Sequence, residues 1–132
     1  MQIGYARVST QDQNLDMQID ALKRAGCEKI FAEKITGTKQ TRPEYELLKE
    51  FIRDGIDTVV VCKLDRMGKS LKNLIEEMGE LERRKIGFRS LQENIDTTTS
   101  GGKLFSKFYK LGYFFATNAM TSLQEYKYII YV

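Results

Sequence analysis

Residues 57–62, with the sequence Asp-Thr-Val-Val-Val-Cys, are apolar and β-branched over most of their length. A strand that is apolar on both faces is typical of the interior of a parallel sheet, because helices cover both faces of such a sheet. We therefore expect residues 57–62 to form a central, parallel strand. The rest of the chain must then supply neighbouring strands and helices for both faces.

The flanking sequence alternates between strand and helix patterns. Three further segments have the composition and alternation of strands, namely residues 2–8, 29–35 and 87–91. Three segments carry apolar residues at helical spacing, and they begin near Leu15, Pro43 and Ser70. Gly26 and Gly55 end the first two helices, whereas Ser70 can cap the third. This order predicts an α/β fold with a mostly parallel sheet of four to five strands and helices on both faces.

The second and third helices each have an apolar face that we expect to be buried. The two faces comprise Tyr45, Leu48, Phe51 and Ile52 in the second helix, and Leu71, Leu74, Ile75, Met78 and Leu81 in the third. A further helical pattern begins at Lys103, and we expect a long C-terminal helix there. Residues 106–132 hold eight of the fourteen aromatic residues. The side chains of Phe105, Phe108, Leu111, Phe114 and Phe115 cover too much of the circumference of a helix to be buried on a single face. We therefore expect residues 103–120 to form an interface between copies of the chain.

The composition excludes several classes of protein. The chain has 132 residues, enough for one domain with a core, and its lack of histidine rules out a Ser-His-Asp hydrolase. Cys27 and Cys62 lack metal-ligand spacing and, without a signal-like N-terminus, indicate reduced thiols and a cytoplasmic protein. No apolar run approaches the ~20 residues of a membrane-spanning helix. The net charge of +3 is compatible with nucleic acid but does not establish it.

Two polar clusters each close a predicted strand. They are Tyr5-Ala6-Arg7-Val8-Ser9-Thr10 and Lys63-Leu64-Asp65-Arg66-Met67-Gly68-Lys69-Ser70. In open α/β sheets, ligands bind beyond the carboxyl ends of the strands, so the two clusters should meet at one site. Their serine, aspartate and arginine side chains suggest an anion-binding site with a hydroxyl nucleophile.

Ser9 is the candidate nucleophile, because it falls just past a strand end where a hydroxyl can meet a ligand. A serine needs activation, and without histidine its proton must be managed by Asp65 or by a nearby cation. Arg7, Arg66 and Arg42 can hold a phosphate through paired N–H donors. No carboxylate cluster has metal-like spacing, so the arginines would supply the charge often supplied by a metal ion. We expect Arg42 to be the most mobile of these residues, because it ends a polar loop.

Each of these residues can also have a purely structural role. A Ser-Thr pair before a helix is more often a helix cap than a nucleophile. Asp65 and Arg66 can form a surface ion pair that adds little stability. Tyr5 can be an ordinary core residue.

Several motifs, in order along the chain, resemble the catalytic domain of the serine recombinases, the resolvase/invertase family of site-specific DNA recombinases. The resemblance covers about residues 1–105. The matching residues are Tyr5-Ala6-Arg7-Val8-Ser9-Thr10, Gln13, Gln18, Arg42, Lys63-Leu64-Asp65-Arg66, Gly87-Phe88-Arg89-Ser90-Leu91 and Ile95-Asp96-Thr97-Thr98-Thr99.

The resemblance implies a role for each matching residue. Ser9 matches the nucleophile that attacks a DNA phosphodiester and forms a 5′-phosphoserine link. The residues that bind and activate the scissile phosphate are matched by Arg7, Arg42 and Arg66. Asp65 matches the acidic residue that orients these arginines or shuttles a proton. The supporting positions are matched by Tyr5, Gln13 and Gln18. Lys69, in the second polar cluster, stands at a position where the family usually has a third arginine.

The resemblance also implies partners and cofactors. The family acts on DNA as a homodimer, with a tetramer for strand exchange, and it uses no metal or other cofactor. The family pattern stops near Phe105 in this chain. We therefore expect a resolvase-like catalytic domain at residues 1–102, and a C-terminal helix with a divergent tail and no DNA-reading domain at residues 103–132.

Three interpretations of the function follow. The first is a serine-type site-specific DNA recombinase, present here as a truncated catalytic domain. The second is a catalytically impaired remnant that acts only as a dimerising or interaction protein. The third is a small phosphatase on the same architecture, which leaves the ordered set of motif matches unexplained.

Overall fold

The computed structural model describes residues 1–9, 14–35, 41–68 and 70–101 of the chain. The helices and strands are β1 Gln2–Ser9, α1 Leu15–Arg24, β2 Lys29–Ile35, α2 Pro43–Phe51, β3 Thr58–Val61, the short 3-10 helix η1 Leu64–Arg66, α3 Leu71–Arg83, β4 Gly87–Ser90 and β5 Ile95–Asp96. The long helix and the tail expected at residues 103–132 lie outside the described residues. No helix within the described ranges is long and apolar enough to cross a membrane.

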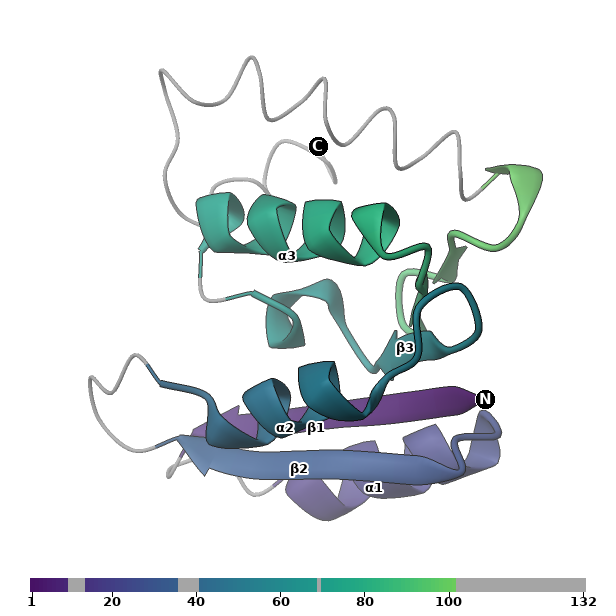
Figure 1. Cartoon of the computed structure of the whole chain (residues 1–132). Helices are drawn as coiled ribbons and strands as arrows, with labels where there is room; N and C mark the ends of the chain where they lie inside the picture. Colours follow the sequence, from purple (N-terminus) through teal and green to yellow (C-terminus); the bar gives the residue numbers. More distant parts are fainter. Residues whose placement is uncertain (10–13, 36–40, 69, 102–132) are drawn as a thin grey trace, which may run out of the picture.

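The strands form one sheet in the order β2-β1-β3-β4-β5 (Figure 1). The first four strands are parallel, and β5 pairs antiparallel with β4. As predicted, β3 lies at the centre, and Val59, Val60 and Val61 are fully buried. The sequence analysis therefore identified the α/β class and the mostly parallel sheet correctly.

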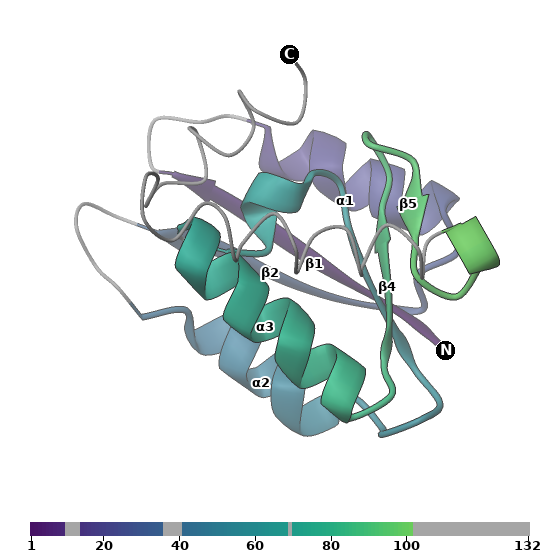
Figure 2. The same ribbon diagram turned by 90° about the horizontal axis from the view of Figure 1, so that it is seen from above.

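Helices cover both faces of the sheet, with α1 on one side and α2 and α3 together on the other (Figure 2). On the first side, Leu22 of α1 packs with Ala6 and Val60. The core on the second side is larger, and among its residues are Tyr5, Tyr45, Leu48, Val59, Val61, Leu74 and Phe88. Strand alternation explains this division, because successive residues of a strand point to opposite faces.

One residue of the expected apolar face of α2 is not buried. Tyr45, Leu48 and Ile52 are buried at helical spacing, but Phe51 is 46% exposed. Phe51 falls on the flank of that face, and its ring packs against Phe31 of the edge strand β2, with ring centroids 5.6 Å apart. The prediction that Phe51 is buried was therefore wrong, because β2 is the edge strand of the sheet formed by the described residues and leaves this ring partly exposed.

Ser70 caps α3 as predicted. Its hydroxyl oxygen accepts a hydrogen bond of 3.1 Å from the backbone N–H of Asn73. The cap fixes the point at which α3 begins, directly after the segment that carries Asp65 and Arg66.

A buried carboxylate anchors the start of β3. Asp57 is 2% exposed. It accepts hydrogen bonds from Arg53, with 2.8 Å to the backbone nitrogen, 3.2 Å to Nε and 2.8 Å to Nη2. These hydrogen bonds are the main reason that the pKa of Asp57 is lowered from 3.8 to about 2.

We expect Asp57→Asn to lower the free energy of unfolding at neutral pH. A carboxylate whose pKa is lowered in the folded state stabilises the protein above its ordinary pKa of 3.8, and this contribution is lost as the pH falls through about 2. The variant should therefore lose that part of the pH dependence, which urea denaturation at a series of pH values would measure. Asp54→Asn is the control, because the Asp54 side chain is 65% exposed. An equal effect of both variants would contradict the special role of Asp57.

Candidate functional site

The two polar clusters lie at the carboxyl ends of neighbouring strands. Ser9 is the last residue of β1 and is exposed. The helix η1 and the residues that follow it as far as Gly68, together called the η1 turn, come directly after β3, the parallel neighbour of β1. This is the edge at which open α/β sheets bind ligands. The predicted common location of the two clusters is thus consistent with the topology.

Backbone carbonyls of the η1 turn bind two arginine side chains from different elements. Arg7 of β1 donates from Nη2 to the carbonyl oxygens of Asp65, at 2.6 Å, and Gly68, at 3.2 Å. Arg42, at the start of α2, donates from Nη1 to the carbonyl oxygen of Met67 at 2.5 Å. The turn therefore brings together side chains that are far apart in the sequence.

A third arginine lies on the turn itself. Arg66 Nε is 3.8 Å from Asp65 Oδ1, and the two side chains are 23% and 27% exposed. The pKa of Arg7 is lowered mainly by burial, and the neighbouring charges of Arg42 and Arg66 lower it further. Arg42 and Arg66 thus both lie close enough to Arg7 to act on its charge, an arrangement suited to an anion with several oxygens.

Tyr5 is buried next to these arginines and is hydrogen-bonded to Glu33 of β2. Burial is the main cause, ahead of this hydrogen bond, of a raised pKa for Tyr5. The Glu33 carboxylate also accepts hydrogen bonds of 3.3 Å from the backbone N–H groups of Glu44 and Tyr45. A negative charge at the N-terminus of a helix is stabilising, so Glu33 fixes the start of α2 and with it the position of Arg42.

The sequence analysis missed Glu33. The available signal was its place in the alternation of β2, where Phe31 and Glu33 share the buried side of the strand. A carboxylate at a buried position of a strand needs hydrogen-bond donors. The sequence did not reveal that these donors come from Tyr5 and α2.

Gln18 of α1 contacts the backbone of Arg7. Its Nε2 donates to the Arg7 carbonyl oxygen at 3.1 Å, and its Oε1 accepts from the Arg7 N–H at 3.3 Å. Gln18 is 7% exposed. This pair of bonds ties α1 to β1 and supports the residue that reaches the η1 turn.

The structure places most of the predicted site residues at this edge, in different environments. Arg42 is only 5% exposed, although it follows a polar loop in the sequence. Ser9 is exposed, two residues after Arg7 on the same side of the strand. The predicted supporting residues Gln13 and Lys69 lie outside the described residues.

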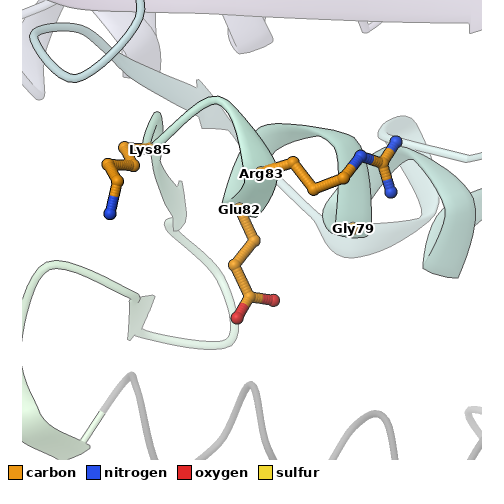
Figure 3. Close-up of a pocket in the computed structure, with 4 residues that line it drawn as sticks. All are labelled: Gly79, Glu82, Arg83 and Lys85. Carbon is orange, nitrogen blue, oxygen red and sulfur yellow. The ribbon is translucent and has the colours of Figure 1, made fainter.

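A pocket lies at the opposite end of α3 from the η1 turn. It is lined by Gly79, Glu82, Arg83 and Lys85, and the side chains of Glu82, Arg83 and Lys85 point in different directions (Figure 3). None of the predicted site residues lines this pocket. In the described part of the chain, no group of three or more His, Cys, Asp or Glu residues is arranged to hold a metal ion.

Fold and site together define an α/β protein with an arginine-rich site at the carboxyl edge of its sheet. Residues 2–119 match the family model "Resolvase, N terminal domain", so the family match continues past Phe105, where the sequence motifs placed its end. The chain belongs to the resolvase family, and the resemblance seen in the sequence motifs is confirmed.

Relatives with known names agree with this membership. The chain is 50% identical over 105 residues to the Tn917 resolvase of Enterococcus faecalis, a match that covers 80% of this chain and 56% of that protein. It is 51% identical over 105 residues to the serine recombinase gin of Escherichia phage Mu, covering 80% and 54%. The chain spans about half the length of these relatives.

A solved structure has the same fold. The N-terminal catalytic domain of TP901-1 integrase superimposes with a TM-score of 0.74 at 27% sequence identity. The match covers 89% of this chain and 98% of that domain. The similarity therefore extends over nearly the whole of a domain that was crystallised by itself.

We expect Gly68→Ala to destabilise the protein. An added Cβ would lie 2.6 Å from Leu74 Cα, so the turn would have to move away from α3 together with a carbonyl oxygen that binds Arg7. Overpacking of this kind costs about 1–3 kcal/mol. Urea denaturation would measure the loss.

Gly79→Ala is the matched control on α3. There the added Cβ would meet only the end of Arg83, at 3.7 Å. Alanine has the higher helix propensity, so this variant should gain up to ~1 kcal/mol. A Gly68→Ala protein as stable as the wild type would show that the close approach to Leu74 is not a constraint.

Proposed function

We propose that the chain is the catalytic domain of a serine-type site-specific DNA recombinase, which cleaves and rejoins DNA through a 5′-phosphoserine intermediate. The main support is the gathering of Arg7, Arg42 and Arg66 around the η1 turn, at the sheet edge where β1 ends in Ser9. Membership of the resolvase family adds to this support. Relatives of the chain are named as resolvases, recombinases and DNA invertases.

In the proposed reaction, Ser9 Oγ attacks the phosphorus of a DNA phosphodiester. A bond forms between Oγ and phosphorus as the bond from phosphorus to the 3′ oxygen breaks, which leaves a 5′-phosphoserine and a free 3′ hydroxyl. The serine loses a proton and the leaving oxygen gains one. Asp65 is the residue that we assign either to this proton transfer or to the orientation of Arg66, which it approaches.

The three arginines would stabilise the transition state. A phosphorus with five oxygen neighbours carries more negative charge on its equatorial oxygens than the ground state does, and positioned guanidinium groups favour that charge. Reversal of the same step by another 3′ hydroxyl rejoins the DNA. The bond energy stays in the serine ester, so the proposed reaction requires no cofactor.

We extend the proposal to the residues that support the site, the oligomeric state and the cellular location of the protein. Tyr5 and Gln18 would hold the site as described above, and Gln13 and Lys69 would complete it. Exchange of two duplexes requires four cleaved strands, so we propose a homodimer that forms a tetramer on DNA. DNA in the cytoplasm is the proposed substrate. Because the chain spans about half the length of these relatives, we propose that it acts as one domain of such an assembly.

We expect Ser9→Ala to abolish covalent attachment to DNA. The substrate would be a pool of labelled, random-sequence DNA duplexes that carry nicks, so that a cleaved strand cannot be rejoined. Protein that becomes covalently linked to DNA would be detected on denaturing gels. Stability should change little, because Ser9 is exposed. Ser100→Ala, at another exposed serine, is the control.

An adduct at the wild-type level in the Ser9→Ala variant would reassign the nucleophile. If the wild-type chain forms no adduct, the non-catalytic interaction role is favoured. Hydrolysis of a small phosphomonoester by the wild type would favour a phosphatase.

Arg66→Ala should slow adduct formation by ~10²–10³, the usual effect of removing a preorganised donor from a developing charge. Time courses of adduct formation would measure this ratio. Arg24→Ala, at an exposed arginine of α1, removes the same net charge away from the site. Equal effects of the two substitutions would indicate only general attraction to DNA rather than a role at the reacting phosphate.

A further inference from the structure

The Arg42 side chain is almost fully excluded from solvent, and the hydrogen-bond acceptors described for it are uncharged. It is 5% exposed. Within the described residues, it donates hydrogen bonds to the carbonyl oxygen of Met67, at 2.5 Å, and to Asn73 Oδ1, at 3.3 Å. Neutral acceptors orient a guanidinium group without neutralising its charge, so the charge remains available to an incoming anion.

The face of Tyr45 supports the same guanidinium. Arg42 Cζ is 4.3 Å from the centroid of the Tyr45 ring, compared with 5.9 Å for the ring of Tyr5. A cation above an aromatic face is attracted by the ring quadrupole, and the attraction is strongest where water is excluded. Tyr45 is fully buried, so this contact is of the strong kind.

The Tyr45 ring is itself fixed from two other directions. Its hydroxyl donates to Glu77 Oε2 of α3 at 2.7 Å. Its ring meets Tyr5 in an edge-to-face arrangement, with centroids 5.1 Å apart. Lys49 lies 3.8 Å from the Glu77 carboxylate, which partly balances the negative charge near the ring.

We infer that Tyr45 is a positioning residue for Arg42, with its ring face fixing the guanidinium at the η1 turn and Glu77 fixing the ring. The inference rests on the proposed function, in which Arg42 contacts the scissile phosphate. Tyr45 acts only through Arg42 and does not touch the substrate. The sequence pattern predicted Tyr45 merely as a buried residue of α2.

The first test needs no DNA. In NMR spectra of the full chain, the Arg42 Nε–Hε signal should be shifted upfield by the ring current of Tyr45. The shift should persist in Tyr45→Phe and vanish in Tyr45→Leu. An unchanged Arg42 signal in Tyr45→Leu would overturn the inference, whether or not the chain proves to be a recombinase.

The second test measures the rate of Ser9–DNA adduct formation with the nicked random-sequence duplexes. Tyr45→Leu should reduce the rate about tenfold or more, and Tyr45→Phe by no more than about threefold, because phenylalanine keeps the aromatic face. In an Arg42→Ala background, Tyr45→Leu should have no further effect. Equal losses in both backgrounds would show that Tyr45 serves only the core.

Two additional variants distinguish a role of Tyr45 in positioning Arg42 from a role in packing the core. Phe88→Leu truncates a core residue that is 1% exposed and lies on β4, and it should leave the adduct rate within about threefold of the wild type. If Tyr45→Leu does not fold, pentafluorophenylalanine at position 45 can be compared with Tyr45→Phe, since it keeps the ring shape and reverses the quadrupole. A slower rate for the fluorinated protein supports the inference, and equal rates overturn it.

Discussion

The backbone carbonyls of the η1 turn hold two arginines that would otherwise repel each other. Arg7 and Arg42 come from different elements, and their charges lie close enough for Arg42 to lower the pKa of Arg7. The turn offers partial negative charge in return, through the carbonyl oxygens of Asp65, Met67 and Gly68. Neutral dipoles stabilise the pair without cancelling its charge, whereas a buried carboxylate in the same place would cancel one of the two charges.

The elements around the turn act together to keep it in place. Gly68 permits close contact with Leu74 of α3, and Ser70 fixes where that helix begins. On the other side, Glu33 caps α2 and accepts a hydrogen bond from Tyr5. The site is therefore built from rigid elements rather than from loops alone, as precise positioning of charged groups requires.

The sequence was sufficient to predict the four parallel strands, the three α-helices and the edge where the polar clusters meet, but not the short antiparallel strand β5. These features follow from periodicity within each segment and from the rule that parallel strands end on one side. The burial of Arg42, the exposure of Phe51 and the role of Glu33 could not be predicted in this way. Each depends on a second element, such as the oxygens of the turn for Arg42 or the edge position of β2 in the described sheet for Phe51, and periodicity in one segment contains no information about these contacts.

The unequal lengths of neighbouring strands have a consequence for the site. Strand β1 pairs with β2 as far as Ser9, but its pairing with β3 ends at Tyr5. The last four residues of β1 thus project past β3, and the Gln18 amide binds the Arg7 N–H and carbonyl there. A side chain takes the place of a missing strand, so the chain of β3 is free to turn away and form η1. Because the pairing of β3 with β1 ends at Tyr5, η1 can lie beside Arg7, and a β3 that paired with the whole of β1 would occupy the place of the turn.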